Sequence, residues 1–239
     1  METTKKTKEM DMLNGGLAGK LILFSIPLAF SSILQQLFNS ADVAVVGRFA
    51  GDRALAAVGS CVALVGIFVN LIVGFSVGPN AVLANLIGQK RRDKINRMLH
   101  TIMAFGLIAG VILMGLGMLS AKPILEVSGT PESVMNEALL YIRIYFIGIP
   151  FMMIYNFGSA VLRSFGDTRR PMYYLILSGT VNVILNLILV IYFKLGVAGV
   201  AIATVISNIL SAGLVLIYLY RREDEFQFRP QRLHIEKED

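Results

Sequence analysis

The stretch LILFSIPLAFSSILQQLFNSADVAVV, residues 21–46, is long enough to cross a lipid bilayer as an α-helix at about 1.5 Å per residue. It contains one acid, Asp42, well inside an apolar segment. An ionised Asp at mid-membrane costs on the order of 3 kcal/mol on insertion scales. Ser31, Gln35 and Asn39 precede Asp42 at intervals that place all four on one helical face. The stretch predicts a membrane helix with a polar face.

The composition predicts the fold class. The chain has 239 residues, of which 55% are hydrophobic, and a mean hydropathy of +0.68. These values exceed those of ordinary soluble domains. We therefore expect an all-α integral membrane protein, a bundle of six transmembrane helices. The predicted spans are residues 21–46, 54–77, 101–119, 138–162, 172–193 and 200–220, with a break in the fourth at Gly148 and Pro150.

The distribution of basic residues predicts the topology. One side of the six spans holds 17 of the 22 Lys and Arg, in both chain ends and in the loops after spans two and four. Such residues gather on the cytoplasmic side. We therefore expect a multi-pass protein of the cell membrane with both termini in the cytoplasm. The predicted organisation is a cytoplasmic tail (1–20), a six-helix transmembrane lobe (21–222) and a cytoplasmic tail or linker (223–239).

Several function classes find no support in the sequence. The net charge of +6 resides in short loops between spans, which is typical of membrane topology and gives no indication of a nucleic-acid partner. Cys61 is the single cysteine, and His100 and His234 are far apart, so no metal-ligand spacing is present. No Walker loop, nucleophile elbow or dinucleotide-binding glycine pattern occurs. We expect neither an enzyme nor a bound cofactor.

Asp42 admits two interpretations. It could be a structural carboxylate, hydrogen-bonded to a neighbouring helix or kept protonated. Alternatively it binds H⁺, or Na⁺, and couples that ion to a substrate, as intramembrane acids commonly do. Gln35 and Asn39 on the same face favour coupling, because they supply neutral dipoles that a cation or an organic compound could share.

Two further polar stripes occur. Each could be hydrogen-bonding between helices, but three stripes in one chain favour a shared hydrated cavity. Tyr155 and Asn156 could face the same interior or simply pack. The stripes comprise Ser178, Asn182 and Asn186 in span five, and Thr204, Asn208 and Ser211 in span six. The glycine pairs 74/78 and 106/110 have the spacing of closely packed membrane helices.

Several motifs resemble one known family. They are PLAFSSILQQLFNSADVAVVG (27–47), LRSFGDTRRP (162–171) and GVAGVAIATVIS (196–207). Together with the basic loop after residue 89, they resemble the amino-terminal half of multidrug and toxic compound extrusion (MATE) transporters. The resemblance covers roughly residues 21–222.

The resemblance implies an H⁺- or Na⁺-coupled antiporter that exports organic, often cationic, small molecules. Asp42 matches the family's coupling acid, with Asn39 one turn before it, and Thr204 matches a span-six threonine. Some members carry Asn and Asp four residues apart in span five. Here those positions are Asn182 and Asn186, so the second acid is missing. The substrate cavity is expected to include Gln35, Asn39, Ser178, Asn208 and Tyr155.

The length implies a missing partner. MATE transporters have two six-helix lobes, and this chain matches one of them. The second lobe is expected to be a carboxy-terminal half absent from this sequence or a second copy of the chain. A truncated inactive half, or a structural membrane subunit, is the alternative. A flippase for lipid-linked substrates would need several cationic cavity residues, for which only Arg143 is a candidate.

Overall fold

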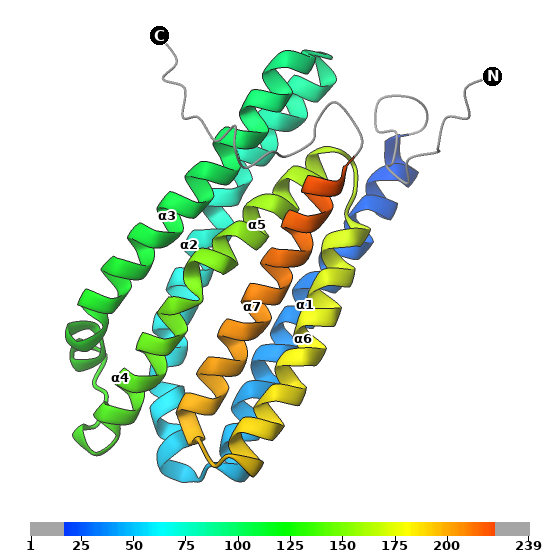
Figure 1. Cartoon of the computed structure of the whole chain (residues 1–239). Helices are drawn as coiled ribbons and strands as arrows, with labels where there is room; N and C mark the ends of the chain where they lie inside the picture. Colours follow the sequence, from blue (N-terminus) through cyan, green and yellow to red (C-terminus); the bar gives the residue numbers. More distant parts are fainter. Residues whose placement is uncertain (1–16, 223–239) are drawn as a thin grey trace.

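The computed structural model describes residues 17–222, which form seven α-helices and one π-helical turn in a single elongated bundle (Figure 1). Residues 1–16 and 223–239, which hold most of both predicted tails, lie outside the described part. The elements are α1 (Leu17–Phe49), α2 (Asp52–Gly88), α3 (Arg92–Val127), α4 (Glu132–Ile147), α5 (Ile149–Ser164), α6 (Arg169–Leu187), the π-helical turn η1 (Ile188–Tyr192) and α7 (Gly196–Arg221).

The predicted six-span fold is confirmed. Within residues 17–222, five helical segments are long and apolar enough to cross a membrane, and α4 and α5 form a sixth span bent by 43°. The bend lies at Gly148, where the predicted break was placed. Gly148 N–H donates to the Tyr145 carbonyl at 2.9 Å. Pro150 follows in the first turn of α5, where a backbone N–H has no partner within the helix, so the lack of one in proline costs no hydrogen bond.

Two details differ from the sequence prediction. The connection expected between residues 120 and 137 is mostly helical, because α3 continues to Val127 and α4 begins at Glu132. The Lys122–Glu126 pair, 3.8 Å apart, supports these extra turns of α3. Span five ends in the π-helical turn η1, which the sequence did not indicate. Lys194 beyond it adopts a positive φ of 55° in the turn to α7.

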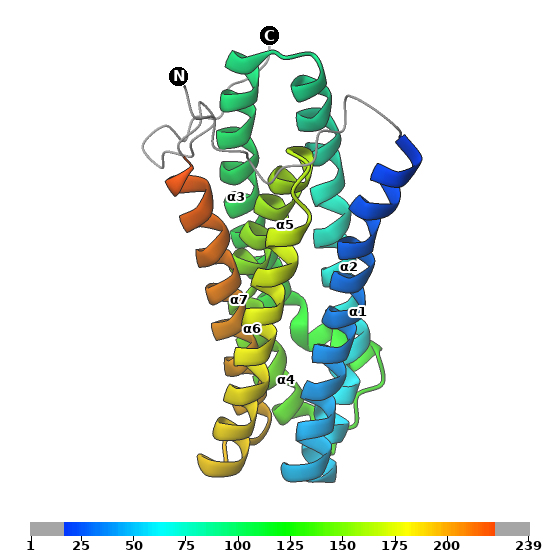
Figure 2. The same ribbon diagram turned by 90° about the vertical axis from the view of Figure 1, so that its right-hand side faces the viewer.

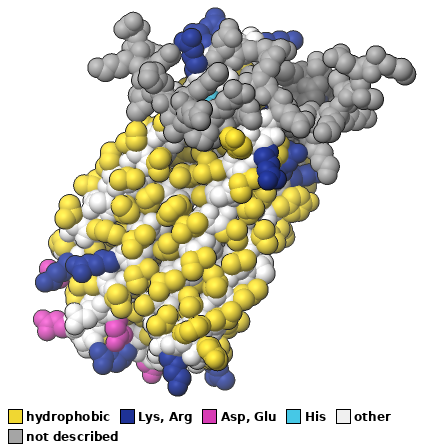
Figure 3. All heavy atoms as spheres, viewed as in Figure 1, with side chains coloured by type: hydrophobic (Ala, Val, Ile, Leu, Met, Phe, Trp, Pro, Cys, Tyr) yellow, Lys and Arg dark blue, Asp and Glu magenta, His cyan; other side chains and the backbone are white. Residues whose placement is uncertain are grey.

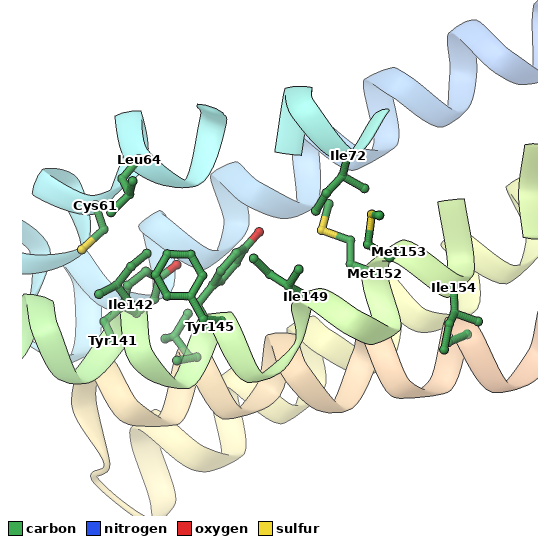
Figure 4. Packing of buried hydrophobic residues seen from close by; sticks show 14 of the residues in the cluster. Cys61, Leu64, Ile72, Tyr141, Ile142, Tyr145, Ile149, Met152, Met153 and Ile154 are labelled. Atoms are coloured by element: carbon green, nitrogen blue, oxygen red, sulfur yellow. The ribbon is translucent and has the colours of Figure 1, made fainter. Parts of the chain in front are cut away.

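The central helix is α5, which lies against α2, α3 and α7, whereas α6 lies between α1 and α7 (Figures 1 and 2). The α2–α3 hairpin extends beyond the other helices at the end where α1 begins and α7 ends. Large apolar side chains fill the core, including Phe146, Phe157 and Met153, which are almost completely buried. Figure 4 shows part of this cluster, with Ile142, Ile149 and Met153 on α4 and α5.

The outer surface fits a lipid environment. In the view of Figure 3, hydrophobic side chains cover the middle of the bundle, and charged side chains lie toward its two ends. Exposed apolar side chains include Ile22, Ile67 and Ile112, each more than half exposed. In water this surface would be unfavourable, whereas in a bilayer it meets hydrocarbon.

The two predicted glycine pairs differ in role. Gly106 and Gly110 are close-packing sites, as predicted: a β-carbon at Gly110 would lie 2.7 Å from Cα of Pro150, so α3 and α5 meet there backbone to backbone. Gly74 and Gly78 are not packing sites in the described part of the chain, because an added β-carbon would have no atom within 4 Å. The spacing is the same, but α2 turns that side away from the bundle.

We expect Gly110→Ala to lower the thermal unfolding temperature of the protein in detergent, because overpacking of this kind costs about 1–3 kcal/mol. Gly115→Ala, in the same helix but with nothing within 4 Å of the added carbon, is the matched control. It should be neutral or slightly stabilising through helix propensity. Equal melting temperatures for the two variants would contradict the close α3–α5 contact.

Candidate functional site

The predicted acid lies at the junction of three helices that are distant in sequence. Asp42 of α1 is only 9% exposed. Its Oδ1 accepts a hydrogen bond from Nδ2 of Asn186 on α6. Its Oδ2 lies 3.4 Å from the Thr204 hydroxyl on α7, which can donate its one proton to this oxygen or to Val200 O at 3.0 Å. The polar stripes predicted in spans one, five and six therefore converge on one carboxylate.

The hydrogen-bond network continues around the carboxylate. Nδ2 of Asn186 also donates to Oδ1 of Asn182 at 3.2 Å, and Asn182 Nδ2 donates to the Thr204 hydroxyl at 3.4 Å. Every partner of Asp42 is neutral: among the described residues no Lys, Arg or His forms an ion pair with it. Neutral donors orient the carboxylate but leave its charge uncompensated.

An uncompensated buried carboxylate is costly, and binding a cation reduces that cost. A second acceptor is available beside it. Oδ1 of Asn186 is buried and has no hydrogen-bond partner in the described part of the chain. Buried polar atoms normally have a partner, so an orphaned acceptor next to an acid favours a site for a proton or a small cation.

A close helix contact positions Asp42. Gly179 of α6 faces Phe38 of α1 so tightly that a β-carbon at residue 179 would overlap the Phe38 ring. This contact lies about one turn before Asp42 on α1 and about two turns before Asn186 on α6. Glycine at position 179 lets the two helices approach, which is why the Asn186 amide can reach the acid.

The predicted cavity residues do come together, around a narrow polar cavity of about 80 Å³. A water molecule needs roughly 10–15 Å³ by this measure, so several waters or one hydrated ion would fit, but a drug-sized molecule, which needs about 300 Å³ or more, would not. Its lining includes all nine predicted site residues except Asn186: Gln35, Asn39, Asp42, Tyr155, Ser178, Asn182, Thr204 and Asn208.

These side chains differ in availability. The Ser178 hydroxyl donates to Leu175 O, and the Tyr155 hydroxyl donates to Pro171 O at 3.0 Å, so both are satisfied by backbone. The side-chain amides of Gln35, Asn39 and Asn208 form no hydrogen bond with residues 17–222. These three amides are therefore the groups free to bind water, an ion or a substrate.

A second cavity, which the sequence did not predict, lies on the α2 side of α1. It has a volume of about 430 Å³, within the range of small-molecule sites. Tyr145, Asn39, Asp42 and Thr204 line both cavities. Figure 4 shows Tyr141 and Tyr145 projecting from α4 toward α1 and α2. The additional polar lining consists of Gln36, Ser40 and Asn70. In the sequence, Tyr141 and Tyr145 lie in an apolar run, and nothing there indicates that they line a cavity.

The described residues contain no set of ligands suited to a transition metal. Among the described residues, no three His, Cys, Asp or Glu side chains come together. Cys61 is buried in the core, where its thiol lies 3.5 Å from the Ala138 carbonyl. The oxygen atoms around Asp42 suit a proton or a hard monovalent cation instead.

The sequence matches a known family model. The model described as MatE matches residues 27–188. Among curated proteins, the probable multidrug resistance protein YoeA of Bacillus subtilis (strain 168) is 33% identical over 210 residues, which is 86% of this chain and 45% of that protein. The chain therefore spans about half the length of such relatives.

The fold matches solved structures of the same kind. A crystal structure of MATE in the bent conformation superposes with a TM-score of 0.89 at 24% identity, covering 98% of this chain and 52% of that one. A crystal structure of MATE in the straight conformation gives a TM-score of 0.80 at 26% identity, with coverages of 95% and 51%. The described bundle corresponds to half of each molecule.

A double-mutant cycle tests the Asp42–Asn186 contact. Asn186→Ala removes a donor from a buried carboxylate and should cost about 1–3 kcal/mol of stability. In the Asp42→Asn background the same change should cost at least about 1 kcal/mol less, measured as thermal unfolding in detergent. Asn156→Ala is the control, because Asn156 bonds only to Met152 O. Strictly additive effects of the Asp42 and Asn186 changes would contradict the contact.

Proposed function

The chain belongs to the MATE family of membrane transporters, and on that basis we propose that it is one lobe of a cation-coupled antiporter that exports organic, often cationic, compounds. MATE proteins are multi-pass, ion-coupled transporters and not enzymes. Relatives are named multidrug resistance or multidrug export proteins. Because this chain covers about half of them, complete transport activity is assigned here to an assembly of two lobes.

The observation that carries the proposal is the environment of Asp42. The Asp42 carboxylate is only 9% exposed, lacks a basic partner in the described chain and borders two cavities. A carboxylate in such a place contributes little to the stability of the fold. Binding H⁺ or Na⁺ compensates its charge. In the proposed site Asp42 binds the ion, Asn186 and Thr204 orient the carboxylate, and Asn182 orients Thr204. Asn39 contributes an amide oxygen when Na⁺ is bound.

Ion binding would alter the packing of α1. When Asp42 is neutral, its hydrogen bonds to the donors on α6 and α7 are weaker than those of the charged carboxylate, so the free-energy difference between arrangements of α1 changes. Pro27 gives α1 a point of weakness, because its ring removes a backbone hydrogen bond inside the helix. Bending of α1 at Pro27 is the proposed link between ion binding and lobe orientation.

Organic substrates are assigned to the cavities beside Asp42. The narrow cavity offers the free amides of Gln35, Asn39 and Asn208. The larger one adds two tyrosine rings, whose faces suit organic cations. No Lys or Arg lines either cavity, and Arg143 is exposed instead. That lining favours cationic cargo over the anionic lipid-linked substrates of a flippase.

We propose that one face of α2 forms the contact with the second lobe. Gly66, Asn70, Gly74 and Gly78 follow one another at intervals of four and so lie along one side of α2. An added β-carbon at any of the three glycines meets nothing within 4 Å. Asn70, which also borders the larger cavity, is exposed in the middle of an apolar span, where lipid would leave its amide unsatisfied. Small and polar residues at membrane depth are typical of a helix–helix interface.

The proposed location is the cell membrane with both termini in the cytoplasm. Helices α1 and α7 place the described ends of the chain at the same end of the bundle (Figure 1). Lys90, Arg91, Arg163 and Arg169 lie in the connections or helix ends on that side. The positive-inside rule then assigns this end to the cytoplasm.

Asp42→Asn should abolish transport driven by an ion gradient. The experiment measures efflux of a fluorescent organic cation from vesicles that contain the assembled two-lobe transporter, under an imposed H⁺ or Na⁺ gradient. The amide keeps the shape of the side chain but cannot be charged. Asp52→Asn, an acid exposed at the start of α2, is the control and should transport normally. Undiminished gradient-driven efflux by the Asp42 variant would refute the proposal.

Gly74→Leu should disrupt association with the second lobe and leave this lobe folded. The leucine has room within the isolated lobe but would enlarge the surface through which we expect α2 to contact its partner. Native mass measurement in detergent should show a smaller associated fraction. Gly115→Leu on α3, also with open space, is the control. Equal association of both variants with the partner lobe would place the interface elsewhere.

A further inference from the structure

A surface groove separates the first halves of α1 and α6. The two helices are in contact at Phe38 and Gly179, but they diverge toward the end of the bundle where α1 begins (Figure 2). The resulting groove, here called the α1–α6 groove, has a volume of about 280 Å³. Its lining consists of Leu23, Ile26, Pro27 and Phe30 of α1 and Arg169, Met172 and Tyr173 of α6.

The chemistry of the groove is divided between its walls and one end. The walls are apolar, and Ile26 and Phe30 are about half exposed on the outer surface of the bundle. Arg169, the first residue of α6, supplies the only charge in the lining. This combination suits a molecule with a long apolar chain and an anionic end.

The Arg169 side chain is available, unlike that of its neighbour. Arg170 forms an ion pair with Asp167 and lies over the Tyr218 ring, 4.4 Å from its centroid. Arg169 uses its backbone N–H to donate to Asp167 Oδ1 at 3.2 Å. Its guanidinium has no ion-pair or hydrogen-bond partner within residues 17–222 and is exposed to the surroundings.

We propose that the α1–α6 groove binds an acyl chain of an anionic phospholipid, with the lipid phosphate held by the Arg169 guanidinium. The groove lies at the height where a headgroup meets the acyl region: Arg169 begins the membrane helix, and Tyr173, one turn further in, is typical of the interface.

Other occupants fit less well. A soluble phosphate would meet Arg169 but leave the apolar walls uncovered. A zwitterionic lipid carries a cationic group beside its phosphate, and no carboxylate lines the groove to receive it. The nearest acid in sequence, Asp167, is buried and paired with Arg170. An anionic lipid matches both the walls and the charge.

The test uses the fact that the chain contains no tryptophan. Tyr173→Trp introduces one fluorophore into the groove of the full chain, reconstituted in phosphatidylcholine vesicles. Brominated phosphatidylglycerol or brominated phosphatidylcholine is then added at equal mole fraction, and fluorescence quenching reports binding. One Arg near a membrane surface favours an anionic lipid by about fivefold, and we expect a preference of that size.

Matched variants test whether the preference for the anionic lipid arises in the groove. Added to Tyr173→Trp, Arg169→Gln should abolish the preference and Arg169→Lys should retain most of it. Arg221→Gln, which removes a charge at the same end of the bundle, should leave it unchanged. Tyr220→Trp, about as exposed as Tyr173 but outside the groove, should show a smaller preference.

Three results would overturn the proposal. Equal quenching by the two lipids would show that the groove does not select charge. Displacement of the brominated lipid by inorganic phosphate would assign Arg169 to a soluble anion. Protection of the introduced tryptophan from both lipids would show that protein covers the groove. None of these measurements requires ion binding by Asp42 or transport, so the lipid-binding proposal and the proposed function can fail separately.

Discussion

The contact between Asp42, Asn186 and Thr204 links the three helices on which the site depends. It joins residues separated by up to 162 positions in sequence, in a medium where an unpaired polar group is costly. The surrounding features follow from it. Gly179 must lack a side chain so that α1 can approach α6, and Asn182 and Thr204 must present polar groups to the same point. The cavities form where these polar groups prevent close apolar packing.

The sequence predicted the membrane class, the six spans and the break at Gly148, because hydropathy and helix breakers are local properties. It also predicted that the stripes of spans one, five and six converge, since each had a single polar face. It could not show that Gly106 and Gly110 pack inside the bundle whereas Gly74 and Gly78 face outward. The two pairs have the same spacing, and spacing does not indicate whether a helix face points into the bundle or away from it. The cavity with Tyr141 and Tyr145 was missed for a related reason: tyrosine in an apolar run resembles ordinary core.

The two surfaces proposed to bind a partner, one on α2 and one between α1 and α6, differ in chemistry. The stripe of small residues on α2 is suited to contact with another helix, since small residues let backbones approach. The α1–α6 groove has large apolar walls and a charged end, which suit a flexible chain with a headgroup. Both occur on helices that line the site: α1 contributes Asp42 and one wall of the groove, and α2 contributes Asn70 to the larger cavity.

The proposed exchange rests on one acid, because the α6 residue bonded to Asp42 is the neutral Asn186. Under the proposed mechanism, a lobe with Asp42 as its single membrane-embedded acid would exchange one monovalent ion per cycle. Exchange for a monovalent organic cation is then electroneutral, so the membrane potential does not contribute and the ion's concentration gradient alone sets the limit. Exchange for an uncharged compound is electrogenic, and each 100 mV adds about 2.3 kcal/mol, or roughly a fiftyfold concentration ratio.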